Sequence, residues 1–254
     1  MALVDLGRVV PNVGQKLPLV DLGTSYTADL KADIQAGKFE KAFVGGYLTI
    51  NGHRYYMAHP DYWYNKGDTK CTTHHMLMFP ANTLNSGQLN PADSNNRSTI
   101  SGGYAGTYAK TGSNSTLTTA INIIKNDFGA SNILTHRERL TNAVSSYYGS
   151  GTGWYDSQVD LPTEAMIYGS TQFLPRSYPG SYISDNSSID ITQLELLRLL
   201  PELITANEAY WLRDIVIIST SFGGGCCACV SDKGNCSYGG TKAVQGIRPV
   251  FAII

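Results

Sequence analysis

Four of the five cysteines lie close together near the end of the sequence, at Cys226, Cys227, Cys229 and Cys236. Thiols at this density could bind zinc, form an internal disulfide or act in cysteine-dependent catalysis. Zinc is disfavoured, because neighbouring cysteines chelate one tetrahedral ion poorly and C-C-x-C lacks the usual two-to-four-residue spacing of zinc ligands. A simpler interpretation is that the cysteines lie in a strand, where successive side chains point to opposite faces. Cys227 and Cys229 would then share one buried face, with Cys226 on the other.

A second group combines a thiol with two imidazoles, at Cys71, His74 and His75. These are candidate zinc ligands, although adjacent histidines in a strand point to opposite faces and cannot both bind one ion unless the strand is broken there. The favoured interpretation is that the histidines are structural and hydrogen-bonded beneath an aromatic loop at residues 61–70. Further potential ligands nearby in the sequence are His53, His59 and Asp61.

Several acidic residues could be combined into an acid/base site, but no spacing fixes a pair of carboxylates at a working distance. Ion pairs within helices, helix caps and solvent-exposed helix faces account for these acidic residues without a catalytic role. The sequence contains no Gly-rich phosphate loop, nucleophile elbow or paired-histidine metalloprotease motif. The residues concerned are His136, Arg137 and Glu138 with Asp156, Asp160 and Glu164, and separately Asp190, Glu195 and Glu202.

Two apolar, β-branched runs, at 210–218 and 246–254, enclose the cysteine group and must position it. Both predict buried core strands, because turn-forming residues bound them and they are too short for helices. Residues 219–246 form an insert rich in Gly, Cys, Ser, Asn and Lys, which predicts an exposed loop or hairpin. Candidate ligand-binding residues in this displayed insert are Ser221, Phe222, Cys226, Ser231, Lys233, Asn235 and Tyr238.

Each run carries an arginine near its start, Arg213 in the first and Arg248 in the second. A guanidinium among apolar residues can hold backbone carbonyls, or a carboxylate such as Asp214, through several fixed donors. We therefore predict that Arg213, Asp214 and Arg248, together with Trp211, are structural residues.

The elements upstream mix strands and helices. Asn51-Gly52 predicts a hairpin over residues 47–57, because this pair accepts the positive φ angles of a type I′ turn. A strand is expected at 75–79. Helices are predicted at 24–38 with Thr24 or Ser25 as cap, at 116–128 opened by Ser115 or Thr116, and at 136–147, 162–168 and 191–200. Helices in mid-chain, strands towards both ends and no βαβ alternation indicate an α+β fold.

Residues 1–23 contain two prolines, three glycines and a repeated Leu-Val-Asp-Leu-Gly. A segment this short cannot bury its own Leu and Val side chains, so it must pack on something else. One interpretation is an extended arm that attaches to a partner, and the other is an edge strand added to the protein's own sheet.

Composition excludes some functions. Charged residues make up 15% of the chain, against about 25% in typical domains, and the net charge is −1 with no basic stripe, which argues against nucleic acid. Polarity comes from Ser, Thr, Asn, Gly and 16 Tyr, which suits packing against neighbours or binding neutral polar ligands. No stretch is long enough for membrane insertion and no signal peptide is evident, which predicts synthesis in a cytoplasm.

The final runs carry the motif WLRD … GxRPxFxI, at residues 211–214 and 246–253. With this motif the chain resembles a family of structural proteins of bacteriophages of gut-type Firmicutes, related to C-type-lectin-like domains. The resemblance covers most of the chain. Upstream it is carried by residues 67–75, by Gly102-Gly103-Tyr104, by His136-Arg137-Glu138 and by residues 154–157.

The resemblance implies a C-type-lectin-like domain at residues 24–254, a mixed antiparallel sheet with helices inserted mid-chain, after an attachment arm at residues 1–23. It implies a virion fibre or decoration protein, made in the host bacterial cytoplasm, whose arm binds other capsid or tail proteins. A homo-oligomer is expected, most simply a trimer, as is a host-surface glycan or protein ligand. In diversified relatives the region of the insert varies, so its cysteines could be tolerated identities.

No cofactor and no enzymatic activity are expected on this interpretation. The alternative is a metal- or cysteine-dependent enzyme on the same fold, because formylglycine-generating enzymes are lectin-like and use cysteines near their C-terminus. Fold alone is poor support for that activity.

Overall fold

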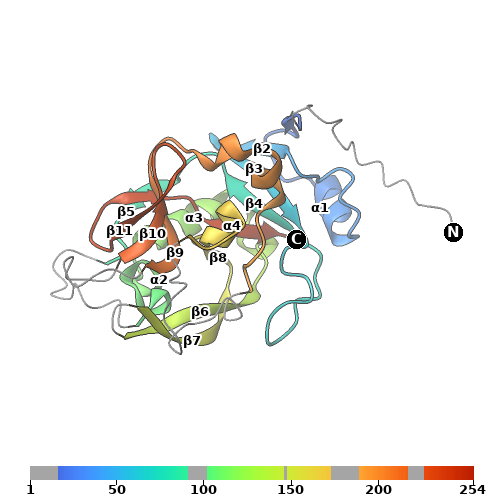
Figure 1. Ribbon diagram of the computed structural model, residues 1–254. Coiled ribbons are helices and arrows are strands. Elements are labelled where there is room, and N and C mark those ends of the chain that lie inside the picture. The colour runs from blue at the N-terminus through green and yellow to red at the C-terminus, as the bar shows by residue number, and fades with distance from the viewer. Residues whose placement is uncertain (1–16, 91–101, 146–147, 173–188, 217–225) are drawn as a thin grey trace.

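The computed structural model describes residues 17–90, 102–145, 148–172, 189–216 and 226–254. They form a mixed α+β structure with two larger sheets, a two-stranded ribbon and short helices (Figure 1). The predicted α+β class is therefore confirmed. Both ends of the described chain lie in the same six-stranded sheet.

The six-stranded sheet is antiparallel except for its first pair, β1 and β2, which are parallel. The predicted hairpin is confirmed, since Asn51 (φ 50°) and Gly52 (φ 86°) make the turn between β2 and β3. The predicted C-terminal core strand is β13, which is buried between β4 and β8. In spatial order the strands are β1 (Val20–Asp21), β2 (Gly46–Ile50), β3 (His53–Pro60), β4 (Met76–Pro80), β13 (Val250–Ile253) and β8 (Val159–Asp160).

The five-stranded sheet contains the other predicted core strand and much of the insert. Residues 210–216 of the predicted run at 210–218 form β9, which pairs with β10 on one side and meets β12 in parallel on the other, and residues 217 and 218 lie outside the described part of the chain. In spatial order the strands are β11 (Cys236–Gly240), β10 (Cys226–Val230), β9 (Tyr210–Val216), β12 (Gln245–Ile247) and β5 (Asn85–Gly87).

The predicted helix at 136–147 is wrong. The chain forms β6 (His136–Ser145), which pairs with β7 (Tyr148–Ser157) in an antiparallel ribbon. His136, Glu138 and Leu140 alternate with more exposed neighbours, so the buried face has a period of two residues. Because two of these three buried side chains are polar, the alternation does not appear in the sequence as a pattern of hydrophobic residues.

The helices are short and lie mainly in mid-chain. Thr27, not Thr24 or Ser25, caps α1, whereas Ser115 caps α3 as predicted. The predicted helices at 162–168 and 191–200 are confirmed in shorter form as α4 and α5. The helices are α1 (Ala28–Gln35), α2 (Tyr108–Thr111), α3 (Thr116–Phe128), α4 (Glu164–Tyr168) and α5 (Glu195–Leu199), with 3-10 turns η1 (Tyr104–Gly106), η2 (Ala130–Asn132) and η4 (Pro201–Ile204).

The core occupies both faces of the six-stranded sheet. On one face, Tyr55 and Met57 of β3 pack with residues of α1 and α3. On the other, Tyr56 and Ala58 pack with residues of α4, α5, β9 and β10, which joins the two large sheets. A third cluster, around Trp211, lies between the five-stranded sheet and the segments α2 and α3. This arrangement fixes β9 and β10 as the rigid base of the insert.

The end of the predicted arm belongs to the domain itself. Residues 17–23 are described, and Val20–Asp21 pairs with β2. Leu17 and Leu22 lie so close to Gly45 and Gly46 that a Cβ on either glycine would collide with them. For residues 17–23 the edge-strand interpretation is therefore confirmed, so an arm boundary at residue 23 is too late. Residues 1–16 lie outside the described part of the chain.

Candidate functional site

Arg248 has the buried, multiply hydrogen-bonded surroundings that its predicted structural role requires. Its guanidinium is completely buried and donates to three backbone carbonyls, those of Pro80 (2.8 Å), Leu203 (2.9 Å) and Ile204 (2.9 Å). It also donates to the Tyr210 hydroxyl (3.3 Å) and lies 4.0 Å from the ring centroid of Phe79. Arg248 thus joins β4, η4 and β9 at one point.

Arg213 is also buried, but its partners differ from the expected one. It donates to Asp190 (2.7 Å) and forms an ion pair with Glu138 (3.1 Å). Asp214 instead accepts the backbone N–H of Glu164 at the start of α4 (2.7 Å). A buried arginine with two buried carboxylates is a costly arrangement that persists only while its members remain paired.

Aromatic and histidine side chains complete this buried cluster. The Trp63 indole donates to Asp190 (2.7 Å), and its ring stacks on His136 with centroids 3.7 Å apart. His136 lies 3.3 Å from Glu138, while its Nδ1 is buried without a partner. Burial, followed by the charge of Glu138, raises the pKa of Asp190 to about 7. Burial lowers the pKa of His136 to about 4, so the imidazole is neutral near pH 7.

The structure brings some of the predicted acid/base residues together and separates others. His136, Glu138 and Asp190 share the Arg213 cluster. Asp160 lies beside it, bound by Lys110 (2.6 Å), Tyr104 (2.8 Å) and Ser157. Asp156 pairs with Arg137 at the surface, and Glu195 lies near Arg198 on α5. Because the clustered side chains are buried, a substrate could reach them only if the core opened.

The cysteine group is mostly apolar packing, as the alternation predicted. Cys226 packs with the cluster between the two large sheets, whereas Cys227 and Cys229 pack on the opposite face around Trp211. All five cysteines lie in the described part of the chain, and none of them forms a disulfide. Burial raises the pKa of the Cys226 thiol to about 11 and the pKa of the Cys227 thiol well above its usual value. Such thiols are poor nucleophiles near neutral pH.

Cys236 lies at a second polar cluster, between β11 and α4. Its thiol donates to Glu164 Oε1 (3.1 Å), and Asp214 accepts the Glu164 backbone N–H (2.7 Å). Burial, followed by the charge of Glu164, raises the pKa of Asp214 to about 7. The ionised form of Asp214 is therefore penalised in the folded protein.

We expect Asp214→Asn to stabilise the protein at pH 8 by about 1 kcal/mol or more. The folded pKa of Asp214 lies above its unfolded value, so its contribution is fully present below pH 4 and is lost as the pH rises towards 7. Asparagine keeps an acceptor for the Glu164 N–H and is never charged. Urea unfolding at pH 8 and pH 4 checks this, with exposed Asp232→Asn as control. An equal gain at both pH values would contradict it.

Cys71, His74 and His75 do not converge on one point. His74 Nδ1 donates to Asp61 (2.7 Å), and its ring stacks on Tyr64 with centroids 4.7 Å apart. His75 accepts the Trp63 backbone N–H (3.0 Å) and donates through Nδ1 to Thr73 (2.8 Å). Both histidines therefore hold the aromatic loop, as the structural interpretation predicted. In the described ranges, no group of three or more His, Cys, Asp or Glu side chains could hold a metal ion.

The described part of the insert forms a hairpin, β10 and β11, which was one of the two predicted forms. Its strand β10 is wholly buried, however, where an exposed segment was predicted. Cys226 lies in this strand, so it cannot contact a ligand and is removed from the candidate residues. Ser231 accepts the N–H groups of Lys233 and Asn235, which closes the turn between β10 and β11. Lys233, Asn235 and Tyr238 are exposed. The other two candidates, Ser221 and Phe222, lie outside the described residues.

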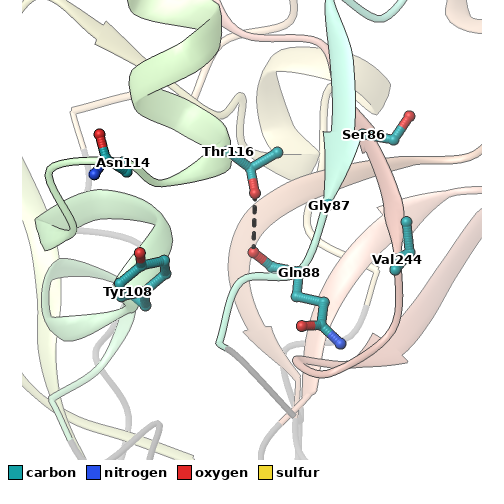
Figure 2. A pocket seen from close by; sticks show the side chains of 7 residues that line it. All are labelled: Ser86, Gly87, Gln88, Tyr108, Asn114, Thr116 and Val244. Carbon is teal, nitrogen blue, oxygen red and sulfur yellow. Dashed lines mark hydrogen bonds between the residues drawn. The ribbon is translucent and has the colours of Figure 1, made fainter. Parts of the chain in front are cut away.

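A pocket that the sequence did not indicate lies beside the insert (Figure 2). It has a volume of about 420 Å³ and lies between the β5 edge, the α2–α3 segment and the turn after β11. Its parts are far apart in the chain, so no local pattern could have revealed it. The lining residues are Ser86 and Gly87 on β5, Gln88 directly after it, Tyr108, Asn114 and Thr116 around the two helices, and Val244 in the turn.

Comparison with family models, curated proteins and solved structures found no match to this chain. Within the described ranges, none of the helices has the length and apolar character needed to cross a membrane.

Proposed function

We propose that this protein is a structural component of a bacteriophage virion, a fibre or decoration subunit that displays a lectin-like domain for binding a host-surface glycan or protein. The resemblance of the WLRD … GxRPxFxI ending and the low charge of the chain support this proposal. The observation that carries it is the β10–β11 hairpin, in which a buried strand anchors a turn and a strand bearing Lys233, Asn235 and Tyr238 at the surface.

A display function suits this hairpin physically. The backbone of β10 is paired on both sides, so exposed side chains on β11 stand on a fixed support. A binding surface on a rigid base loses less conformational entropy when a ligand binds. Polar and tyrosine side chains at such a surface suit a neutral polar ligand.

The experiment that tests the location is mass spectrometry of purified, intact virions. Peptides of this chain should be present in amounts comparable to those of other minor structural proteins, and they should persist after nuclease treatment and density-gradient purification. Absence of the chain from intact particles would refute the proposal.

We expect a variant lacking residues 1–16 to keep its fold and to lose attachment to particles. The cut leaves residues 17–23 in place, since β1 and the leucines beside it belong to the domain's own sheet. Light scattering and circular dichroism report folding, and co-sedimentation with particles reports attachment. The longer deletion of residues 1–23 is the matched comparison and should also lower stability. A 1–16 deletion that still attaches would show that the contact lies elsewhere.

A further inference from the structure

The pocket beside the insert is built on well-fixed parts of the structure. Its floor is Gly87, whose carbonyl accepts the indole N–H of buried Trp211 (3.0 Å). A Cβ at Gly87 would overlap the side chain of Thr116, so only glycine allows Thr116 to pack this closely against β5. The amide of Gln88 donates to the Lys242 carbonyl (2.6 Å), which holds the turn after β11 against β5.

The two sides of the pocket carry different chemistry (Figure 2). Tyr108 and Asn114 lie on one side, and the Tyr108 ring is backed by Gly112, where a Cβ would collide with it. Val244 lies on the opposite side and is 67% exposed. The pocket therefore has an aromatic face and an aliphatic edge, with hydroxyl and amide groups between them.

The lining carries no formal charge: none of its residues is Asp, Glu, Lys, Arg or His. The neighbouring Lys110 is held by Asp160 (2.6 Å) and does not line the pocket. A phosphate or carboxylate ligand would need a cationic partner to repay its desolvation, and none is present in the lining. An apolar ligand would displace water from the polar groups of the lining, among them the Asn114 amide, and could not replace its hydrogen bonds.

We propose that this pocket binds a neutral saccharide. Sugar hydroxyls both donate and accept hydrogen bonds, as do the amide and hydroxyl side chains here. The C–H face of a sugar ring is apolar and can pack on the Tyr108 ring, while Val244 covers its edge. The volume of about 420 Å³ lies within the range of small-molecule sites. This inference deepens the proposed display function and rests on it for the encounter with a cell-surface glycan.

Binding can be tested on the full-length protein by saturation-transfer difference NMR with glucose, galactose, mannose, N-acetylglucosamine and their β-linked disaccharides, with sialic acid as the charged comparison. We expect at least one neutral sugar to bind and sialic acid not to bind. Tyr108→Ala should weaken the binding at least about tenfold, because it removes the aromatic face. Ile191→Ala is the control, since Ile191 is an exposed apolar residue (56%) outside both the pocket and the hairpin. Tyr238→Ala tests the hairpin surface as the competing site, because Tyr108 and Tyr238 are similarly exposed, at 41% and 43%.

Each result decides a different point. Loss of binding in Tyr108→Ala with retention in Ile191→Ala supports the pocket, provided that both variants melt like the wild type. Loss in Tyr238→Ala alone would place the site on the hairpin and overturn the inference. Binding of none of the neutral sugars, or equal binding of sialic acid, would overturn the ligand class. Because the assay uses isolated protein, its failure is distinct from absence of the chain from virions.

Discussion

Replacing Arg248 by methionine should lower the free energy of unfolding by about 3 kcal/mol or more. Methionine fills similar space but leaves the carbonyls of Pro80 and Leu203 without their donor, and it removes the contact with the Phe79 ring. Urea unfolding followed by circular dichroism measures the change. The cost arises because a buried acceptor that loses its partner retains its desolvation penalty.

Arg54→Met is the matched control for Arg248→Met. Arg54 is exposed and lies over the Tyr47 ring, so its loss removes one surface cation–π contact. We expect it to change stability by less than about 1 kcal/mol. An Arg248→Met variant that unfolds like the wild type would contradict the structural assignment of Arg248, as would one that keeps its stability but loses ligand binding.

Arg213→Met should destabilise the protein at least as strongly, by about 3 to 5 kcal/mol, because it leaves Glu138 and Asp190 buried without their cation. The loss should grow with pH. The pKa of Asp190 is raised to about 7, above its unfolded value, so its contribution to stability falls as the pH rises from about 4 to 7. Without Arg213 that fall should be larger and extend to higher pH.

Trp63 provides a local readout for this variant, because its indole donates to Asp190. Its fluorescence should change in Arg213→Met before global unfolding. Arg137→Met is the matched control on the neighbouring ribbon, where Arg137 pairs with Asp68 and Asp156 at the surface. We expect this control to leave both the fluorescence and the pH profile unchanged. A loss in Arg213→Met that is identical at pH 5 and pH 8 would contradict the proposed role of the buried carboxylates.

Local patterns in the sequence predicted the elements whose stability is local. Asn51-Gly52 set the hairpin turn, and Ser115 capped α3, because both depend on backbone conformations within a few residues. The burial of Arg213 and Arg248 was also predictable, since each is embedded in an apolar strand pattern. What could not be predicted was the partner of each arginine. Glu138 and Asp190 are 75 and 23 residues from Arg213 in the sequence (213 − 138 and 213 − 190).

The wrong predictions of a helix at 136–147 and of an exposed Cys226 share one physical cause. In both places the structure buries residues that the sequence pattern assigns to the surface. His136 and Glu138 face inward only because Arg213 and Trp63 meet them there, so the strand was mistaken for a helix. Cys226 was expected at the surface because the residues around it are small and polar, but β9 and the core beneath it bury the strand. The pocket at Tyr108 depends on contacts between β5, α3 and the turn after β11, which no local spacing records.

The strand pairing described above also sets the order in which the chain can acquire its structure. β2, β3 and β4 can pair as neighbours soon after they are synthesised, but β4 gains its second partner only through residues 251–253, and β5 gains its partner only through residues 245–247. Pairings this remote in sequence are slow to form. A nascent chain must therefore hold the exposed edges of β4 and β5 unpaired until residues 245–253 have been synthesised. The chaperones of the expressing cell and the yield of recombinant protein are expected to respond to those edges more than to any property of the finished fold.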